Sequence, residues 1–63
     1  MTDEEILKGL KEIVCAQHEN AIAALRESIA EDEAAGRERA VTFWREELAE
    51  TEASLQSLRN LPV

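Results

Sequence analysis

One apolar stripe constrains this chain more than any other feature of its sequence. Large side chains recur at steps of three or four residues, the spacing that places them on one side of an α-helix. Leu7, His18 and Ile29 are eleven residues apart, close to three full turns, so the stripe runs nearly straight along the axis. Its members are Leu7, Leu10, Val14, His18, Ile22, Leu25 and Ile29. Such a stripe needs another apolar surface to cover it.

A second stripe follows in the second half of the chain. It consists of Val41, Trp44, Leu48, Thr51, Leu55 and Leu58, at strict three-four heptad spacing. Pro62 disfavours helical backbone at Leu61, so this helix should end near Asn60. The first helix should begin at Thr2, because Thr2 and Glu5 have the spacing of a capping box.

The segment between the two stripes allows two structures. Gly36 can cap the first helix in the left-handed conformation and turn the chain into a helical hairpin. Alternatively, a single helix runs through the segment. The charges favour the single helix, because Glu31, Asp32 and Glu33 oppose the dipole at a helix C-terminus.

The phase of the two stripes favours the hairpin. At 100° per residue, the stripes on a single helix would be offset by roughly a quarter turn. A hairpin lets each helix turn its own stripe inward, and apolar burial outweighs terminal charge effects of about 0.3–1 kcal/mol each. We therefore predict an all-α, coiled-coil-like antiparallel hairpin forming one domain over residues 1–63. Helix one should span about 3–35 and helix two about 38–60, with Trp44 level with Ile29 and Leu55 level with His18.

The chain is too small to cover both stripes by itself. A domain of 63 residues buries only about 60 % of the surface of its unfolded chain. The single cysteine, Cys15, excludes an intrachain disulfide. We therefore predict a homodimer in which two hairpins form a four-helix bundle. The predicted helix–helix core comprises Leu7, Leu10, Val14, His18, Ile22, Leu25, Ile29, Val41, Trp44, Leu48, Leu55 and Leu58.

The net charge of −7 disfavours direct binding to nucleic acid, which depends on a basic surface. No run of apolar residues is long enough to span a membrane, and the acidic N-terminal segment does not resemble a secretory signal. These features predict a cytoplasmic protein.

The acids Glu31, Asp32 and Glu33 oppose the helix dipole, and Phe43 lies off the second stripe, so these four are the candidate partner-binding residues.

No group of residues forms a recognisable chemical site. His18 is predicted to be a core histidine, hydrogen-bonded to a residue such as Thr51 or Gln17 rather than acting as a pH sensor. Cys15 and His18 could share a helix face in a zinc site, but a lone cysteine is more often a small buried apolar residue. The sequence has no phosphate-binding glycine loop and no isolated carboxylate pair. We expect neither an enzyme nor a cofactor.

The sequence is best explained as a protein–protein interaction module, a small acidic adaptor or inhibitor that docks on a larger protein, with a basic protein as one candidate. Two alternatives stay open. The chain could mimic nucleic acid and block a basic nucleic-acid-binding protein, as an inhibitor of phage or anti-defence type. It could also be a purely structural assembly element. Salt dependence separates a mimic from an apolar docking face.

Overall fold

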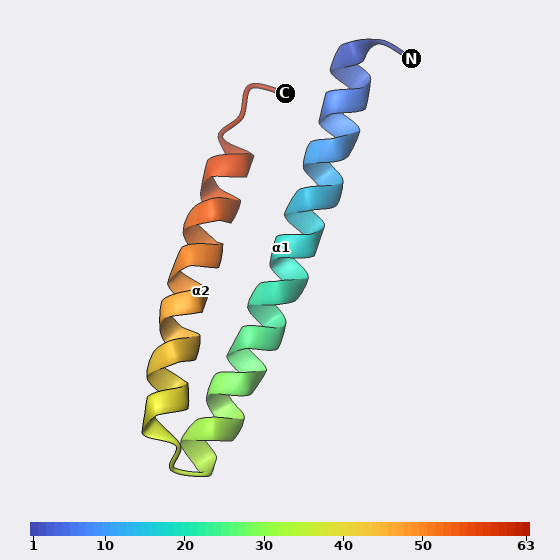
Figure 1. Ribbon diagram of the computed structural model, residues 1–63. Coiled ribbons are helices and arrows are strands. Elements are labelled where there is room, and N and C mark those ends of the chain that lie inside the picture. The colour runs from blue at the N-terminus through green and yellow to red at the C-terminus, as the bar shows by residue number, and fades with distance from the viewer.

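The computed structural model describes residues 1–63 and contains two α-helices joined by a short turn (Figure 1). Helix α1 spans Asp3–Ala34 and helix α2 spans Glu38–Arg59. The helices run antiparallel, so both chain termini lie at the end opposite the turn, here called the open end (Figure 1). The predicted all-α hairpin is therefore confirmed, and a single continuous helix is excluded. Neither helix combines the length and the apolar character needed to cross a membrane.

Helix α1 begins at the predicted cap. Thr2 has extended backbone, and its hydroxyl oxygen accepts a hydrogen bond of 3.2 Å from the amide of Glu5. The acids of the first turn lie beside the positive end of the helix dipole. The return bond from the Glu5 side chain, which a complete capping box requires, is not formed.

Gly36 ends helix α1 and reverses the chain. Its φ of +73° lies in the left-handed region, where glycine is favoured. The amide of Gly36 donates to the carbonyl of Glu33 at 3.1 Å, and the amide of Arg37 donates to the carbonyl of Asp32 at 2.9 Å. These two bonds make a Schellman motif, which satisfies carbonyls that the helix end would otherwise leave free.

The contact between the helices is a thin seam. Only Ile22, Val41 and Leu55 are buried, with exposed fractions of 9 %, 7 % and 6 %. Most other predicted core residues are half-buried: Val14, His18, Leu25, Ile29, Trp44, Leu48 and Leu58. Leu7 and Leu10 remain about half exposed, so one hairpin by itself does not provide the core that the sequence predicts for them.

Two of the neighbours across the seam lie about one helical turn from the predicted pairs, whereas Val14 and Leu58, which have the predicted register, border one hollow. Leu55 was predicted to be level with His18 but borders the same hollow as Ile22. Trp44 was predicted level with Ile29, and its indole nitrogen bonds to Asp32. Side chains lean toward the N-terminus of their own helix, and this lean shifts contacts between antiparallel helices in the observed direction.

The two glycines provide a matched test of the fold. Gly36→Ala should lower the free energy of unfolding by about 1–2 kcal/mol, because alanine is strained at positive φ. Gly9→Ala should raise it by up to about 1 kcal/mol, because Gly9 lies inside helix α1 and an added methyl group meets nothing within 4 Å. Urea unfolding followed by circular dichroism measures both changes. Equal effects of the two substitutions would contradict the assigned turn.

Candidate interaction surfaces

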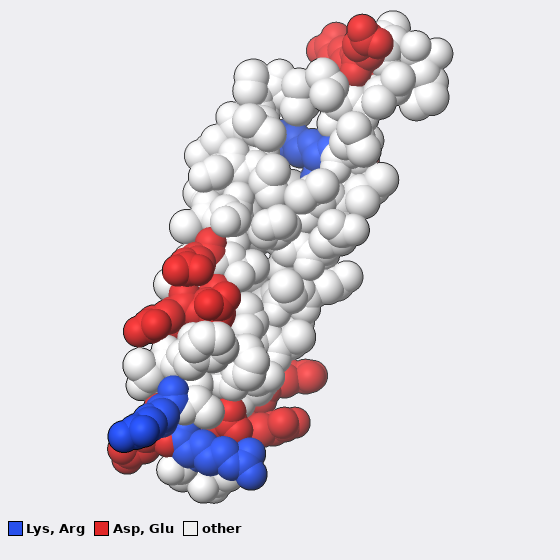
Figure 2. Space-filling model, in the orientation of Figure 1, with Lys and Arg blue, Asp and Glu red and all other residues white.

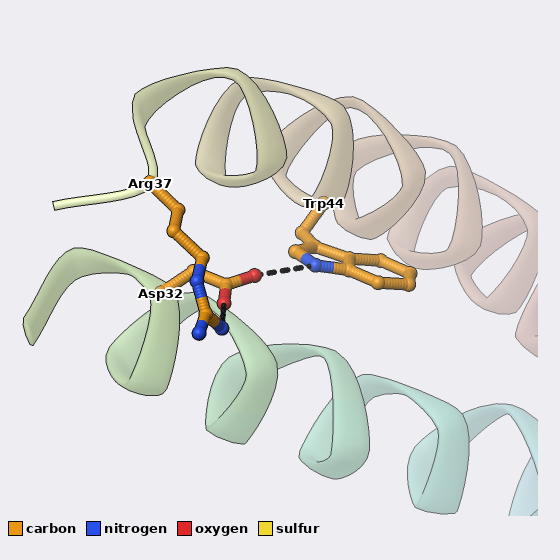
Figure 3. Close-up of polar contacts among 3 residues, drawn as sticks. All are labelled: Asp32, Arg37 and Trp44. Atoms are coloured by element: carbon orange, nitrogen blue, oxygen red, sulfur yellow. Dashed lines mark hydrogen bonds and ion pairs between the residues drawn. The ribbon is translucent and has the colours of Figure 1, made fainter. Parts of the chain in front are cut away.

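The carboxylate of Asp32 ties the end of α1 to the start of α2 (Figure 3). Its Oδ2 accepts a hydrogen bond of 2.9 Å from the indole nitrogen of Trp44, and its Oδ1 accepts one of 3.1 Å from Nη1 of Arg37. The Asp32 side chain is only 13 % exposed, so water screens these bonds poorly. This three-residue contact, the Asp32 clasp, holds the two helices together beside the turn.

The Asp32 clasp changes the interpretation of the acidic cluster. From the sequence, Glu31, Asp32 and Glu33 oppose the helix dipole and so are candidates for binding a partner. In the structure, Asp32 is held in the clasp, and Glu33 accepts a hydrogen bond of 2.9 Å from Arg45 of α2. Only Glu31 is exposed without a side-chain partner. Two of the three acids therefore already join the helices of the hairpin.

One side of the hairpin, here called the charged side, has side chains of both signs along the seam. Near its middle, one hollow is lined by the buried Ile22 and Leu55 and by four charged residues, Glu19, Arg26, Glu52 and Arg59. Arg59 donates to Glu19 across the seam at 2.6 Å, as Arg45 does to Glu33 nearer the turn. All four ion-pairing side chains are at least half exposed, so these pairs fix alignment more than they add stability.

The opposite side is largely uncharged and is here called the uncharged side (Figure 2). Acidic groups gather along the outer edge of α2 and at the N-terminal tip, both signs occur near the turn, and one basic group lies in the face near the open end (Figure 2). The rest of the broad surface between them carries no charge (Figure 2). Two adjoining hollows of this side meet at the open end. They are lined by Leu7, Leu10, Lys11, Val14 and His18 of α1 and by Ser54, Ser57, Leu58, Leu61 and Val63.

Lys11 fastens the C-terminal segment to α1. Its ammonium group donates to the carbonyl oxygens of Arg59, Leu61 and Val63, at 3.1, 2.9 and 3.0 Å. A cation at the C-terminus of α2 also complements the helix dipole. This role was not predicted from the sequence. Lys11 falls in the same angular sector as His18 and Ile22, and this position is the one sequence signal that indicates it.

Phe43 lies close to the Asp32 clasp but is not enclosed. Its ring packs edge-on against Trp44, with centroids 5.0 Å apart and planes at 67°. It nevertheless remains 52 % exposed. An exposed phenylalanine held by a fixed neighbour can insert into a pocket of another protein with little loss of conformational entropy.

His18 and Cys15 do not meet in a chemical site. The Nδ1 atom of His18 lies 2.9 Å from the carbonyl oxygen of Val14, so the ring bonds to the backbone of its own helix rather than to the side chain of Thr51 or Gln17 as predicted. Thr51 instead donates to the carbonyl of Glu47. Cys15 is a half-buried free thiol. No group of three or more metal-ligating side chains comes together in the structure.

Comparison with known protein families, with curated proteins and with solved structures finds no match to this chain. Any functional inference therefore depends on the two sides of the hairpin and on the exposed ring of Phe43.

Substitution of Asp32 tests the clasp. Asp32→Ala should lower the free energy of unfolding by about 2–3 kcal/mol, because it removes a charged acceptor and leaves the Trp44 indole nitrogen unpaired. Asp32→Asn should be milder, since one acceptor oxygen remains. The control Glu31→Ala changes an exposed residue without a side-chain partner and should stay within about 0.5 kcal/mol of the parent. Urea unfolding followed by Trp44 fluorescence measures all three, and an Asp32→Ala variant as stable as the control would refute the clasp.

Substitution of Lys11 tests the fastening of the C-terminal segment. Lys11→Met keeps much of the apolar stem but removes the three bonds, so the amides of Leu61 and Val63 should exchange with deuterium faster. Lys8→Met is the control, because Lys8 lies on the same helix and beside the same segment, but its side chain forms no hydrogen bond. Unchanged exchange at Leu61 and Val63 in the Lys11 variant would contradict the assignment.

Proposed function

We propose that this chain is a protein–protein interaction module without catalytic activity, a small acidic adaptor or inhibitor that docks on a larger protein. The single observation that carries the proposal is the exposure of the uncharged side. The hairpin buries only three side chains, while Leu7, Leu10, Leu61 and Phe43 stay about half exposed. Exposed apolar surface of this extent on a small protein marks a binding face.

The proposed working form is a homodimer that builds a four-helix bundle. The hairpin exposes 4856 Å², whereas a compact monomer of 7.1 kDa exposes about 4,100 Å². The excess is roughly the 800 Å² that each partner buries in a standard protein interface. The elongated shape, with extents of 51 × 15 × 10 Å, produces this excess because two helices cover only one side of each other.

The proposed contact with a larger protein lies at the turn end. Phe43 provides the anchor there, because its ring is exposed and held against Trp44. The neighbouring acid Glu31 is exposed, and the chain carries a net charge of −7. A basic partner surface would therefore be attracted to the module and oriented by its charge.

The alternative of a nucleic-acid mimic has weaker support. A mimic presents rows of unpaired negative charge, but Glu19, Asp32 and Glu33 are each paired with an arginine of the same chain. The excess of acids over bases still favours a basic partner. Binding that weakens steeply as ionic strength rises would favour the mimic, and binding that is insensitive to salt would favour apolar docking. A purely structural assembly element would bind no other protein.

Phe43 separates docking from folding. The partner is first captured by cross-linking in lysate of the source cells and then purified, so that its affinity for each variant can be measured. Phe43→Ala should weaken that affinity by roughly 30-fold, the effect of losing an interface anchor. The melting temperature of the variant should stay within a few degrees of the parent.

Glu52→Ala is the matched control, because Glu52 is exposed on the charged side of the same helix and forms no hydrogen bond. Its affinity for the partner should equal that of the parent. If Phe43→Ala binds the partner as tightly as the control, or melts the fold, the ring is not the docking anchor.

A further inference from the structure

The open end carries most of the exposed apolar surface of the hairpin. Leu7 is 51 % exposed, Leu10 52 % and Leu61 47 %. These side chains line one hollow together with Val14 and Leu58, so they form one continuous patch, here called the open-end patch. The adjoining hollow continues it along the seam to His18 and Ser54.

The polar groups around the open-end patch offer little to recognise a foreign protein. The ammonium group of Lys11 is already bound to three carbonyls of the same chain. The Nδ1 of His18 is held by the carbonyl of Val14. Ser54 and Ser57 are the remaining polar side chains of the two hollows. A surface of this kind selects a partner by apolar shape and not by charge.

Charge also restricts the way in which two copies can approach each other. Each chain carries a net charge of −7, so copies repel wherever their acidic surfaces face each other. The only charged side chain that lines the open-end patch is Lys11, whose ammonium group is bound to three backbone oxygens of its own chain. No acidic side chain lines the patch, and two copies can therefore meet there without placing carboxylates against carboxylates. An apolar patch is also complementary to itself, as a two-fold interface requires.

We infer that the occupant of the open-end patch is the same patch of a second copy. The inference rests on the proposed function and specifies the face through which its dimer forms. The open-end patches of the two copies pack together, so Leu7, Leu10 and Leu61 become buried, and the charged sides with their ion pairs face outward. Phe43 lies beside the turn at the far end of the hairpin and stays outside the contact made by the patch.

Two variants with the same added charge on opposite sides of α1 test this face. Leu10→Glu places a carboxylate in the open-end patch, and Ala23→Glu places one on the charged side. Both positions are exposed in the single hairpin, so both variants should keep their helical circular dichroism. Sedimentation equilibrium between 1 and 100 µM should give twice the 7.1 kDa monomer mass for the parent and for Ala23→Glu.

Leu10→Glu should sediment as a monomer, with a dimer Kd raised by roughly 100-fold, because each dimer would bury two unpaired carboxylates. Should its spectrum show unfolding, Leu61→Glu provides a second variant of the patch outside the helices. A parent that is monomeric at 100 µM, or patch variants that dimerise like Ala23→Glu, would overturn the inference.

The outcome is separable from that of the proposed function. The parent could prove monomeric while Phe43→Ala still weakens binding to the partner. That result would refute the dimer interface at the open-end patch and leave the docking role of Phe43 intact. Conversely, Leu10→Glu could dissociate the dimer while the parent binds no larger protein. That result would support the inferred dimer interface and refute the adaptor role.

Discussion

The left-handed backbone of Gly36 is the constraint on which the rest of the hairpin depends. It reverses the chain within three residues, so the two apolar stripes can face each other. The same reversal brings Asp32 within reach of both Trp44 and Arg37. The Schellman bonds and the Asp32 clasp act on the same few residues, one through the backbone and the other through side chains. The turn is therefore the most heavily bonded part of an otherwise thin structure.

Much of the fold could be predicted from the sequence because it depends on periodicity and on one glycine. The two stripes differ in phase, and this difference alone distinguished the hairpin from a single helix. The Thr2 cap and the turn at Gly36 follow from local residue preferences that need no tertiary information. The helix ends lie within one residue of their predicted positions.

The details of the surface could not be predicted in the same way. The acids at the end of α1 oppose its dipole, and only the folded chain shows that Trp44 and Arg45 of α2 bind two of them. The role of Lys11 depends on carbonyls about fifty residues away. No role was predicted for Lys11 from the sequence, although its position falls in the angular sector of the apolar stripe. Such contacts depend on the register between the helices, which the stripes define only to about one turn.

The hairpin thus separates its two sides by chemistry. On the charged side, Arg45 and Arg59 of α2 form ion pairs across the seam with Glu33 and Glu19 of α1, so part of its charge is paired within the chain. The uncharged side has no comparable internal partners for Leu7, Leu10 and Leu61. Because the core is thin, the leucines of the uncharged side stay exposed and the hairpin has more surface than a compact monomer. That exposed apolar surface is the basis of the proposed role in protein–protein association.

The contacts of Lys11 also indicate the order in which the hairpin folds. They join residues 48 to 52 positions apart, whereas the Asp32 clasp joins residues no more than 12 apart. The entropy lost in closing a loop grows with its length, so the helices should zip together from the turn and reach Lys11 last. The open end is then the first part to fray and the last to form. The leucines exposed there belong to the least cooperative part of the chain, and association at that end would stabilise the segment that the monomer holds most weakly.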